Sequence, residues 1–471
     1  MIPEAERAAV VVGGGITGLA SAWRLRRAGV DALCLESSNR PGGALSSRRV
    51  DGFVLEAGAN TVQENPALAG LIREVGLVGE LLRAPRNLAR FVYRFGLLHP
   101  LPTSLLSGLA SKLISARAKG RFLGELAVKR RTETNDESVE AFVRRRFGVE
   151  LVDALVAPFV SGTFAGDPAA LSAQALMPSL VAMEERYGGV LRGVLASAVV
   201  GRGRRGKEER GLISFRDGLE TLPLRLAAEL GDAIQMGTEV LAITRDTASG
   251  GFKVELRDRV GRRRSVSSRA VIVACSAWAA AGLLDGLTRE ASHALAEVPA
   301  ASLATVSLAW PCSDISHTLR GLGFLVAAGE RVRTLGCLWN SSIFPARAPA
   351  DQAWFTAFLG GARDPQAAAL PDDLLVDLAA RELGEILGAR GRPRALAVDR
   401  HRSALPQYGL GHAERMKRAK AAVVAVPGLF LAGNYLNGVS VGECARQGEQ
   451  AAADACAFLS ETVDFPRRNM L

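Results

Sequence analysis

The chain has 471 residues, of which 48% are hydrophobic and 23% charged, and its formal net charge is +10. This composition excludes a disordered chain, and the length predicts two or three globular domains. The positive charge favours anionic partners such as acidic lipid headgroups or carboxylate substrates. The sequence has no motif of a nucleic-acid-binding protein, so nucleic acid is not an expected partner.

The six cysteines form no Cys-x-x-Cys pair, and no histidine cluster accompanies them. We therefore expect neither a metal site nor a disulfide framework. The first residues lack the pattern of a signal peptide, and no apolar run of about 18 residues or more predicts a membrane-spanning helix. These features favour a cytoplasmic protein and leave open a peripheral position on the inner face of the cell membrane.

The first recognisable motif is a glycine turn between a strand and a helix. Residues 8–12, AAVVV, are apolar and β-branched, as in a buried parallel strand. Gly13, Gly15 and Gly18 then form Gly-x-Gly-x-x-Gly, and a helix is expected at about 16–28. The positive end of this helix would face a pyrophosphate. The alternative is a glycine-rich turn that binds nothing.

The segments that follow favour a flavin nucleotide over a nicotinamide. A second apolar run ends in Glu36, about twenty residues beyond the glycines, where a ribose hydroxyl needs an acceptor. The chain then adds Arg40 and the pair Gly42-Gly43, and later the segment Gly58–Thr61. Here it resembles the flavin-containing amine oxidase superfamily. That resemblance implies an Arg-x-Gly-Gly loop at the FAD phosphates and a Gly-Ala-Asn segment beside the isoalloxazine ring.

The resemblance also implies a cofactor domain built from separate segments. We expect an α/β fold with an FAD-binding Rossmann-type domain assembled from discontinuous segments, a mixed-sheet substrate domain and a helical insert. The expected FAD-binding segments are 1–84, 206–294 and 406–471. The expected inserts are a mostly helical segment, 85–205, with some substrate-pocket residues, and an antiparallel-sheet substrate domain, 295–405, whose alternating patterns predict strands.

The middle and last segments supply the remaining expected cofactor contacts. Val240 lies on a predicted strand at the place where the superfamily touches adenine. Gly433 and Asn434 end the last strand, and a helix is expected to begin after GVSVGE. Cys444 lies near the flavin, but the resemblance implies FAD held noncovalently. The expected FAD contacts are Gly13, Gly14, Gly15, Ile16, Thr17, Gly18, Glu36, Ser37, Arg40, Gly42, Gly43, Gly58, Ala59, Asn60, Thr61, Val240, Trp278, Gly433, Asn434, Val439 and Val441.

Residues 97–131 mix leucines with cations, as in a helix that lies in a membrane interface. The alternative is a helical lid with a solvated face. The cations are Lys112, Arg117, Lys119, Arg121, Lys129, Arg130 and Arg131.

Further stretches resemble, more narrowly, the oxygen-dependent protoporphyrinogen oxidase family, over nearly the whole chain. These stretches are residues 158–172, 215–223, 321–326, 339–349, 358–365, 405–412 and 433–444. The resemblance implies that a reduced tetrapyrrole loses six electrons in three flavin cycles, with dioxygen as acceptor and hydrogen peroxide as product. The flavin would carry the chemistry, so no catalytic side chain is expected.

The same resemblance implies a substrate pocket with apolar walls and one cation. Arg90 matches an arginine beside the substrate carboxylate, Leu325 and Phe344 match residues that sandwich a pyrrole ring, and Gly162 matches a backbone position of the pocket. The alternatives stay open. Arg90 can be an ordinary surface arginine, the two apolar residues can be core packing, and the glycine can serve a tight turn.

Three other functions compete with this interpretation. A coproporphyrinogen III oxidase would act on a substrate with four propionates and should need more cations than Arg90. An amine oxidase would need an aromatic cage and a pocket lysine, and of the four tyrosines only Tyr435 lies by the expected flavin. A binding or escort protein could keep the fold without the flavin. A homodimer and the hand-off of product to a chelatase are further expectations about partners.

Overall fold

The computed structural model describes residues 5–102, 105–133, 135–199, 211–247 and 250–461. Its first layer is a seven-stranded sheet in the order β10-β2-β1-β13-β12-β11, with β19 also paired to β13. Parallel pairing joins β10, β2, β1, β13 and β19, whereas β12 and β11 continue the sheet as an antiparallel meander. The strands are β1 (Ala5–Val12), β2 (Ala32–Leu35), β10 (Ile234–Gln235), β11 (Glu239–Arg245), β12 (Phe252–Arg257), β13 (Arg263–Val273) and β19 (Leu429–Leu431).

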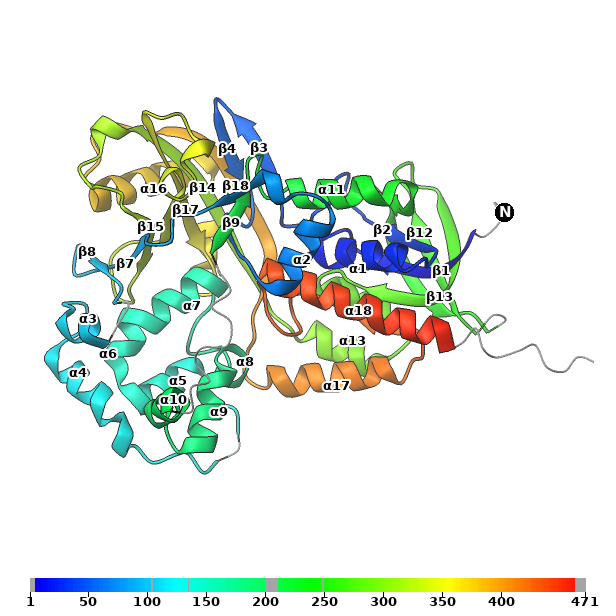
Figure 1. Cartoon of the computed structure of the whole chain (residues 1–471), viewed down its shortest axis with the longest axis horizontal. Helices are drawn as coiled ribbons and strands as arrows, with labels where there is room; N and C mark the ends of the chain where they lie inside the picture. Colours follow the sequence, from blue (N-terminus) through cyan, green and yellow to red (C-terminus); the bar gives the residue numbers. More distant parts are fainter. Residues whose placement is uncertain (1–4, 103–104, 134, 200–210, 248–249, 462–471) are drawn as a thin grey trace, which may run out of the picture.

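Both faces of this sheet are covered, because side chains of β1 alternate between two cores. Ala9 and Val11 pack with helices α1, α2, α11 and α18, whereas Val10 and Val12 pack with the meander and helices α12, α13 and α17. Figure 1 shows α1 and α18 lying side by side. The helices are α1 (Ile16–Arg27), α2 (Pro66–Glu74), α11 (Thr221–Leu230), α12 (Ala277–Leu284), α13 (Arg289–Ala296), α17 (His412–Val424) and α18 (Val441–Glu461).

The second layer is another seven-stranded sheet, in the order β18-β14-β17-β16-β15-β7-β8. All its pairs are antiparallel except β15 with β7. Helix α16 covers one face, where three tryptophan or phenylalanine side chains are fully buried. The elements are β7 (Ala89–Arg94), β8 (Leu97–Pro100), β14 (Ala300–Pro311), β15 (Gly321–Val326), β16 (Thr334–Trp339), α14 (Asn340–Ile343), β17 (Gln352–Gly360), α15 (Pro365–Ala368), α16 (Asp372–Leu387) and β18 (Arg394–Pro406).

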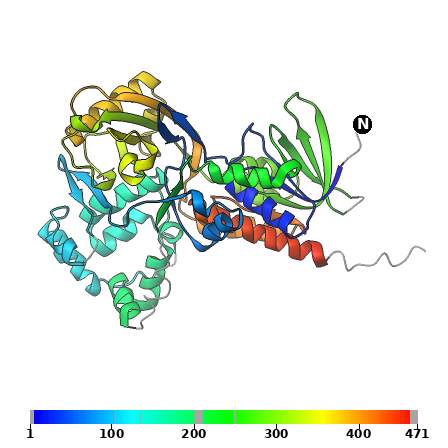
Figure 2. The same cartoon turned by 45° about the horizontal axis from the view of Figure 1, so that its top comes forward.

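A group of helices between residues 105 and 199 lies below the second sheet in both views (Figures 1 and 2). Its core includes Phe142 and Val160, and Arg146 and Glu125 form a fully buried ion pair inside it. The helices are α3 (Leu105–Ala110), α4 (Ala116–Leu123), α5 (Val139–Phe147), α6 (Val149–Leu151), α7 (Ala157–Phe164), α8 (Ala173–Leu176), α9 (Pro178–Tyr187) and α10 (Val190–Val199).

Two small sheets lie where these parts meet. The hairpin of β3 (Ser47–Val50) and β4 (Phe53–Glu56) packs its apolar residues on Trp354 of the second sheet. A three-stranded sheet joins β5 (Val62–Gln63), β9 (Leu212–Phe215) and β6 (Leu81–Arg83). These connections bring residues 47–63 close to the second sheet.

The predicted fold class is confirmed, but two local expectations differ from the structure. Residues 89–100 were assigned to the helical insert, yet they form β7 and β8, because Phe91 and Tyr93 alternate into the core of the second sheet. The last helix begins at Val441, two residues before Glu443 rather than after it. In the part of the chain that the structure describes, no helix is both long and apolar enough to span a bilayer.

Candidate functional site

The glycine turn follows β1 at the carboxyl edge of the parallel sheet. Gly13 has φ +107°, and a Cβ on Gly18 would lie 1.8 Å from the Gly13 carbonyl oxygen, so both positions require glycine. Around Gly15, in contrast, a Cβ would meet nothing within 4 Å. Helix α1 starts directly after Gly15, with no side-chain cap and no acidic residue in its first turn. Its first amides are therefore available to an anion.

Glu36 closes this turn from the end of β2. Its Oε2 accepts a hydrogen bond of 2.6 Å from the Gly14 amide, and its Oε1 accepts one of 2.7 Å from the Ser38 amide. Glu36 is 9% exposed, and each of its carboxylate oxygens has further lone-pair capacity beyond these bonds. This position fits the predicted contact with a ribose hydroxyl.

The loop after β2 folds back onto the glycine turn. The Gly42 amide donates to the Gly14 carbonyl at 2.8 Å, and Gly42 also pairs with Gly15 in a short parallel bridge. Arg40 donates to the carbonyls of Gly43 and Leu45 at 2.7 and 3.1 Å. In this structure Arg40 therefore stabilises the loop, and its contact with a cofactor phosphate stays a prediction.

Residues 57–61 pack against the loop that follows β2. A Cβ on Gly58 would lie 2.1 Å from the Ala44 carbonyl oxygen, so the segment lies directly against the loop. Asn60 is 5% exposed; its Nδ2 donates to the Gly58 carbonyl at 3.0 Å, and its Oδ1 has no hydrogen-bond partner among the described residues. A buried acceptor without a donor is costly, so a ligand with an N–H or O–H group fits this position.

The last segment completes the surface beside α1. A Cβ on Gly448 of α18 would lie 2.3 Å from the Thr17 carbonyl oxygen, which brings the start of α18 beside α1. Gln447 accepts a hydrogen bond of 3.3 Å from the Gly433 amide, and the Tyr408 hydroxyl donates to the Asn434 carbonyl. The predicted residues Gly433 and Asn434 are thus fixed through their backbone atoms.

His412 and Tyr408 have structural roles at this edge. Their rings stack with centroids 4.2 Å apart, and His412 Nε2 lies 2.8 Å from the Tyr435 carbonyl oxygen. Burial lowers the pKa of His412 to about 4 and raises the pKa of Tyr408 above its usual value. Near pH 7 both groups are therefore neutral, and backbone carbonyls hold both the Tyr408 hydroxyl and His412 Nε2.

Two predicted cofactor residues lie on other elements of this domain. Trp278, at the start of α12, is 66% exposed just beyond the carboxyl end of β13, so its ring is free for a contact. Val240 is half-buried on β11 at a register irregularity. The remaining predicted residues lie on the segments already described: Ile16, Thr17, Ser37, Ala59, Thr61, Val439 and Val441.

Three of the four predicted substrate residues come together on the second sheet. Arg90 pairs with Gly323, and Leu325 is the next residue of β15 on the same face. From helix α7, a Cβ on Gly162 would lie 2.2 Å from the Leu325 Cδ2. Arg90 is exposed, and no ion pair joins its side chain to another described residue. This face lies opposite the core that contains Phe324 and Cys337.

The fourth residue, Phe344, follows α14 and is 3% exposed. Its ring lies 5.8 Å from the guanidinium carbon of Arg347. Sequence reasoning missed Arg347 and its partner Glu56, both 1% exposed and 2.6 Å apart. The two residues lie 291 positions apart, so no local pattern could have paired them.

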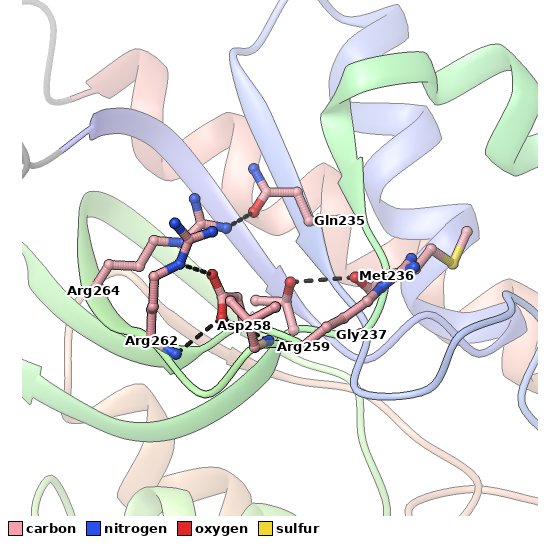
Figure 3. Close-up of a pocket in the computed structure, with 9 residues that line it drawn as sticks. Gln235, Met236, Gly237, Asp258, Arg259, Arg262 and Arg264 are labelled. Carbon is pink, nitrogen blue, oxygen red and sulfur yellow. Dashed lines mark hydrogen bonds and ion pairs between the residues drawn. The ribbon is translucent and has the colours of Figure 1, made fainter.

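A separate hollow of about 320 Å³ opens beyond Glu36 (Figure 3). In this view the Arg264 side chain points toward Gln235, to which it donates a hydrogen bond of 2.6 Å, and Arg262 points toward Asp258. The hollow contains none of the predicted site residues. Its wall supports Glu36 through the backbone, since the Glu36 amide donates to the Gln235 carbonyl at 2.9 Å.

No group of three or more His, Cys, Asp or Glu side chains that could hold a metal occurs in the described ranges. The six cysteines are free. The candidate site therefore consists of the glycine turn and its flanking loops, together with the face of the second sheet that carries Arg90 and Leu325.

Comparison with known proteins identifies the class. A family model described as flavin containing amine oxidoreductase matches residues 16–456. The chain therefore belongs to the flavin containing amine oxidoreductase family, whose cofactor is a flavin.

Within that family the similarity is to porphyrinogen oxidases, which confirms the resemblance predicted from the sequence. Protoporphyrinogen oxidase 1 of Spinacia oleracea chloroplasts is 32% identical over 97% of this chain and 85% of its own length. Protoporphyrinogen oxidase of Homo sapiens is 32% identical over 95% and 98%. Coproporphyrinogen III oxidase of Bacillus subtilis is 27% identical over 96% and 98%.

Solved structures agree with this assignment. One from Exiguobacterium sp. 255-15, provisionally assigned as a protoporphyrinogen oxidase, superposes with a TM-score of 0.80 at 27% identity, covering 97% of this chain and 100% of the other. Putrescine oxidase bound to putrescine gives a TM-score of 0.67 at 16% identity, with the same coverage, and shares the fold.

Proposed function

We propose that this chain is an FAD-dependent oxidase that converts protoporphyrinogen IX to protoporphyrin IX in porphyrin and heme biosynthesis. Dioxygen is the proposed acceptor and hydrogen peroxide the proposed second product. The observation that carries this proposal is the link between two parts of the structure: the glycine turn with its open helix amides, and the sheet face with Arg90 beside Leu325 and Gly162. Helix α7, which carries Gly162, reaches the cofactor side through Phe164, whose ring lies 6.3 Å from that of Tyr408, and the Tyr408 hydroxyl donates to the Asn434 carbonyl.

The residues at the turn fit FAD. The open space at Gly15 accommodates a pyrophosphate, Glu36 can accept from a ribose hydroxyl, and the unpartnered Oδ1 of Asn60 can accept from the flavin end. When bound, the flavin supplies hydride acceptance and reoxidation by dioxygen. Noncovalent binding is supported at Cys444, because burial raises the pKa of its thiol to about 11 and keeps it protonated.

The chain's own residues bind and orient the substrate. Arg90 can pair with a propionate through two parallel hydrogen bonds, and the half-buried Leu325 can present apolar surface to a pyrrole ring. Phe344 is 3% exposed in this structure, so its contact with the pyrrole ring stays a prediction. Helix α7 exposes Phe159 on the same side as Gly162, one turn earlier, which adds apolar surface. None of the four residues assigned to the substrate wall, Arg90, Gly162, Leu325 and Phe344, is a base at neutral pH, so we expect the pyrrole protons to pass to solvent.

Coproporphyrinogen III is the second candidate substrate, because the Bacillus subtilis relative carries that name. Its four propionates would need several cations. On this face of β7, Arg90 is the exposed cation, whereas Arg94 is 9% exposed and pairs with Glu150. We therefore favour protoporphyrinogen IX.

Aerobic turnover with each porphyrinogen tests this function. The purified holoenzyme should form fluorescent porphyrin faster from protoporphyrinogen IX, with about three peroxides per porphyrin from three two-electron cycles. Preferred turnover of coproporphyrinogen III would select the second candidate. No porphyrin from either substrate above the uncatalysed rate would contradict the function.

Peripheral membrane contact belongs to the same proposal. Leu123 and Leu126 are 49% and 39% exposed beside Arg121, and Val194 and Leu195 of the adjoining helix α10 are 48% and 58% exposed. Apolar side chains flanked by cations favour an anionic bilayer surface. The protein should sediment with vesicles that contain about 30% phosphatidylserine and remain in solution with pure phosphatidylcholine. A protein that sediments with neither kind of vesicle would exclude the contact.

A further inference from the structure

A buried ion pair joins strand β4 to the segment between β16 and β17 of the second sheet. Arg347 Nη2 lies 2.6 Å from Glu56 Oε1, and both side chains are 1% exposed. Arg347 also donates to the Val54 carbonyl at 2.8 Å and to the Ser214 hydroxyl at 2.9 Å. Its planar fork thus binds three acceptors on β4 and β9, which fixes a single orientation of the side chain.

Two aromatic rings lie near the Arg347 guanidinium: Phe344, which follows α14, and Trp354 of β17. The guanidinium carbon lies 5.8 Å from the ring centroids of both Phe344 and Trp354. Trp354 in turn contacts Phe53 of the hairpin edge to face, with centroids 6.3 Å apart. The Arg347 amide also donates to the Phe344 carbonyl at 3.0 Å, so Arg347 contacts Phe344 through both its ring and its backbone.

Glu56 connects the same pair to the glycine turn. Its carboxylate also accepts from the Ser47 hydroxyl at 2.5 Å and from the Leu219 amide at 2.9 Å. The next residue, Ala57, donates to the Ser46 carbonyl at 2.8 Å, in the loop whose Gly42 amide binds the turn. Contacts therefore run without a gap from the turn, through residues 42–58, to Arg347 and Phe344.

We infer that Arg347 and Glu56 are positioning residues, which hold the Phe344 wall at a fixed distance from the flavin-side segment 57–61. This inference rests on the proposed function, because it assigns Phe344 to the substrate wall. A buried ion pair is a poor source of stability compared with apolar packing, whereas its directional bonds specify one geometry. The pair therefore matters more for the geometry of the reaction than for the fold.

The first test compares Arg347→Met with a matched control, Arg146→Met. Arg146 is equally buried, pairs with Glu125 and lies in the helical region away from the turn. Both variants should lower the unfolding temperature of the holoenzyme. Under anaerobic single turnover with protoporphyrinogen IX, Arg347→Met should slow flavin reduction at saturating substrate about tenfold or more, whereas Arg146→Met should keep the wild-type rate.

Two further variants apply if Arg347→Met does not fold. In the double variant Glu56→Gln with Arg347→Met, both buried charges are removed, so stability should recover while the slow reduction persists. Arg347→Lys keeps the charge but loses the fork, so its rate should fall between the wild type and Arg347→Met.

A second readout needs no substrate. The visible absorbance band of the bound flavin should shift in the Arg347 variants, because segment 57–61 moves, and should stay unchanged in Arg146→Met. Wild-type reduction rates and an unchanged spectrum in a folded Arg347 variant would overturn the inference. If the wild-type flavin is not reduced by any porphyrinogen, the proposed function fails instead, and the spectral shift alone still tests the positioning of segment 57–61.

Discussion

Glu36 shows how one side chain serves both the turn and the ligand. Its carboxylate accepts short hydrogen bonds from the Gly14 and Ser38 amides, and its oxygens can accept more. A hydrogen bond to a charged group contributes about 1.5–3 kcal/mol, so losing it should be visible in cofactor affinity.

The variant Glu36→Ala should therefore bind FAD roughly 10- to 100-fold more weakly. Fluorescence titration of the apoprotein with FAD measures the dissociation constant. Asp31→Ala is a suitable control, because Asp31 precedes the same strand and its side chain makes exposed ion pairs with Arg7 and Arg26. An affinity for FAD equal to the wild type in Glu36→Ala would remove Glu36 from the ribose site.

Arg90 is the residue on which substrate recognition depends. Arg90→Ala should raise the KM for protoporphyrinogen IX about tenfold, since one charged hydrogen-bonded contact is lost, and should leave bound FAD unchanged. Steady-state kinetics and the flavin content of the purified variant measure both quantities. Arg394→Ala, which removes an exposed arginine from β18 of the same sheet, should alter neither. Unaltered kinetics in Arg90→Ala would place Arg90 outside the site.

At the scale of elements, the β1–α1 turn separates packing from ligand binding. Gly15→Ala adds a methyl group to open space, so the apoprotein should keep its stability while FAD affinity falls on the order of tenfold or more. In Gly18→Ala the added Cβ would lie 1.8 Å from the Gly13 carbonyl oxygen, so this variant should destabilise the apoprotein by about 1–3 kcal/mol. Thermal unfolding and FAD titration of both variants test this division. Equal loss of stability in the two would contradict it.

The turn between β18 and α17 predicts a pH dependence of stability. His412 has a native pKa of about 4, below its ordinary 6.5, so the unfolded chain binds the proton first. Stability should therefore fall as the pH decreases from 6.5 to 4, by about 2–3 kcal/mol from this residue, and the contribution should be constant below that window.

His412→Phe keeps a ring against Tyr408 and removes the titration. Its free energy of unfolding should fall less than that of the wild type between pH 6.5 and 4. Parallel pH dependences for the two proteins, measured by urea unfolding, would exclude His412 as a source of acid lability.

At the scale of the whole molecule, the sequence predicts what is local and misses what is distant. The glycine turn, α1, Glu36 and the loop at Arg40 follow one another within about thirty residues, so their geometry could be predicted from spacing. The strand β7 pairs in parallel with β15, more than two hundred residues later, and its alternation was hidden in a segment expected to be helical. The ion pair of Arg347 with Glu56 could not be predicted for the same reason, because the two residues are far apart in the sequence.

Several polar contacts hold the β3–β4 hairpin against the second sheet. Besides Arg347 and Glu56, Arg48 binds Asp399 with hydrogen bonds of 2.8 and 2.6 Å, and His401 Nε2 lies 2.6 Å from the Ala57 carbonyl oxygen. All these contacts lie on or next to the β3–β4 hairpin. The hairpin and the residue that follows it therefore connect segment 57–61 to the second sheet.

Anaerobic mixing of the purified protein with protoporphyrinogen IX tests the central claim most directly. The absorbance of the bound flavin near 450 nm should bleach within the time of one turnover and return when dioxygen is admitted, with porphyrin formed. A flavin-loaded protein whose absorbance is unchanged by protoporphyrinogen IX and by coproporphyrinogen III would contradict the account.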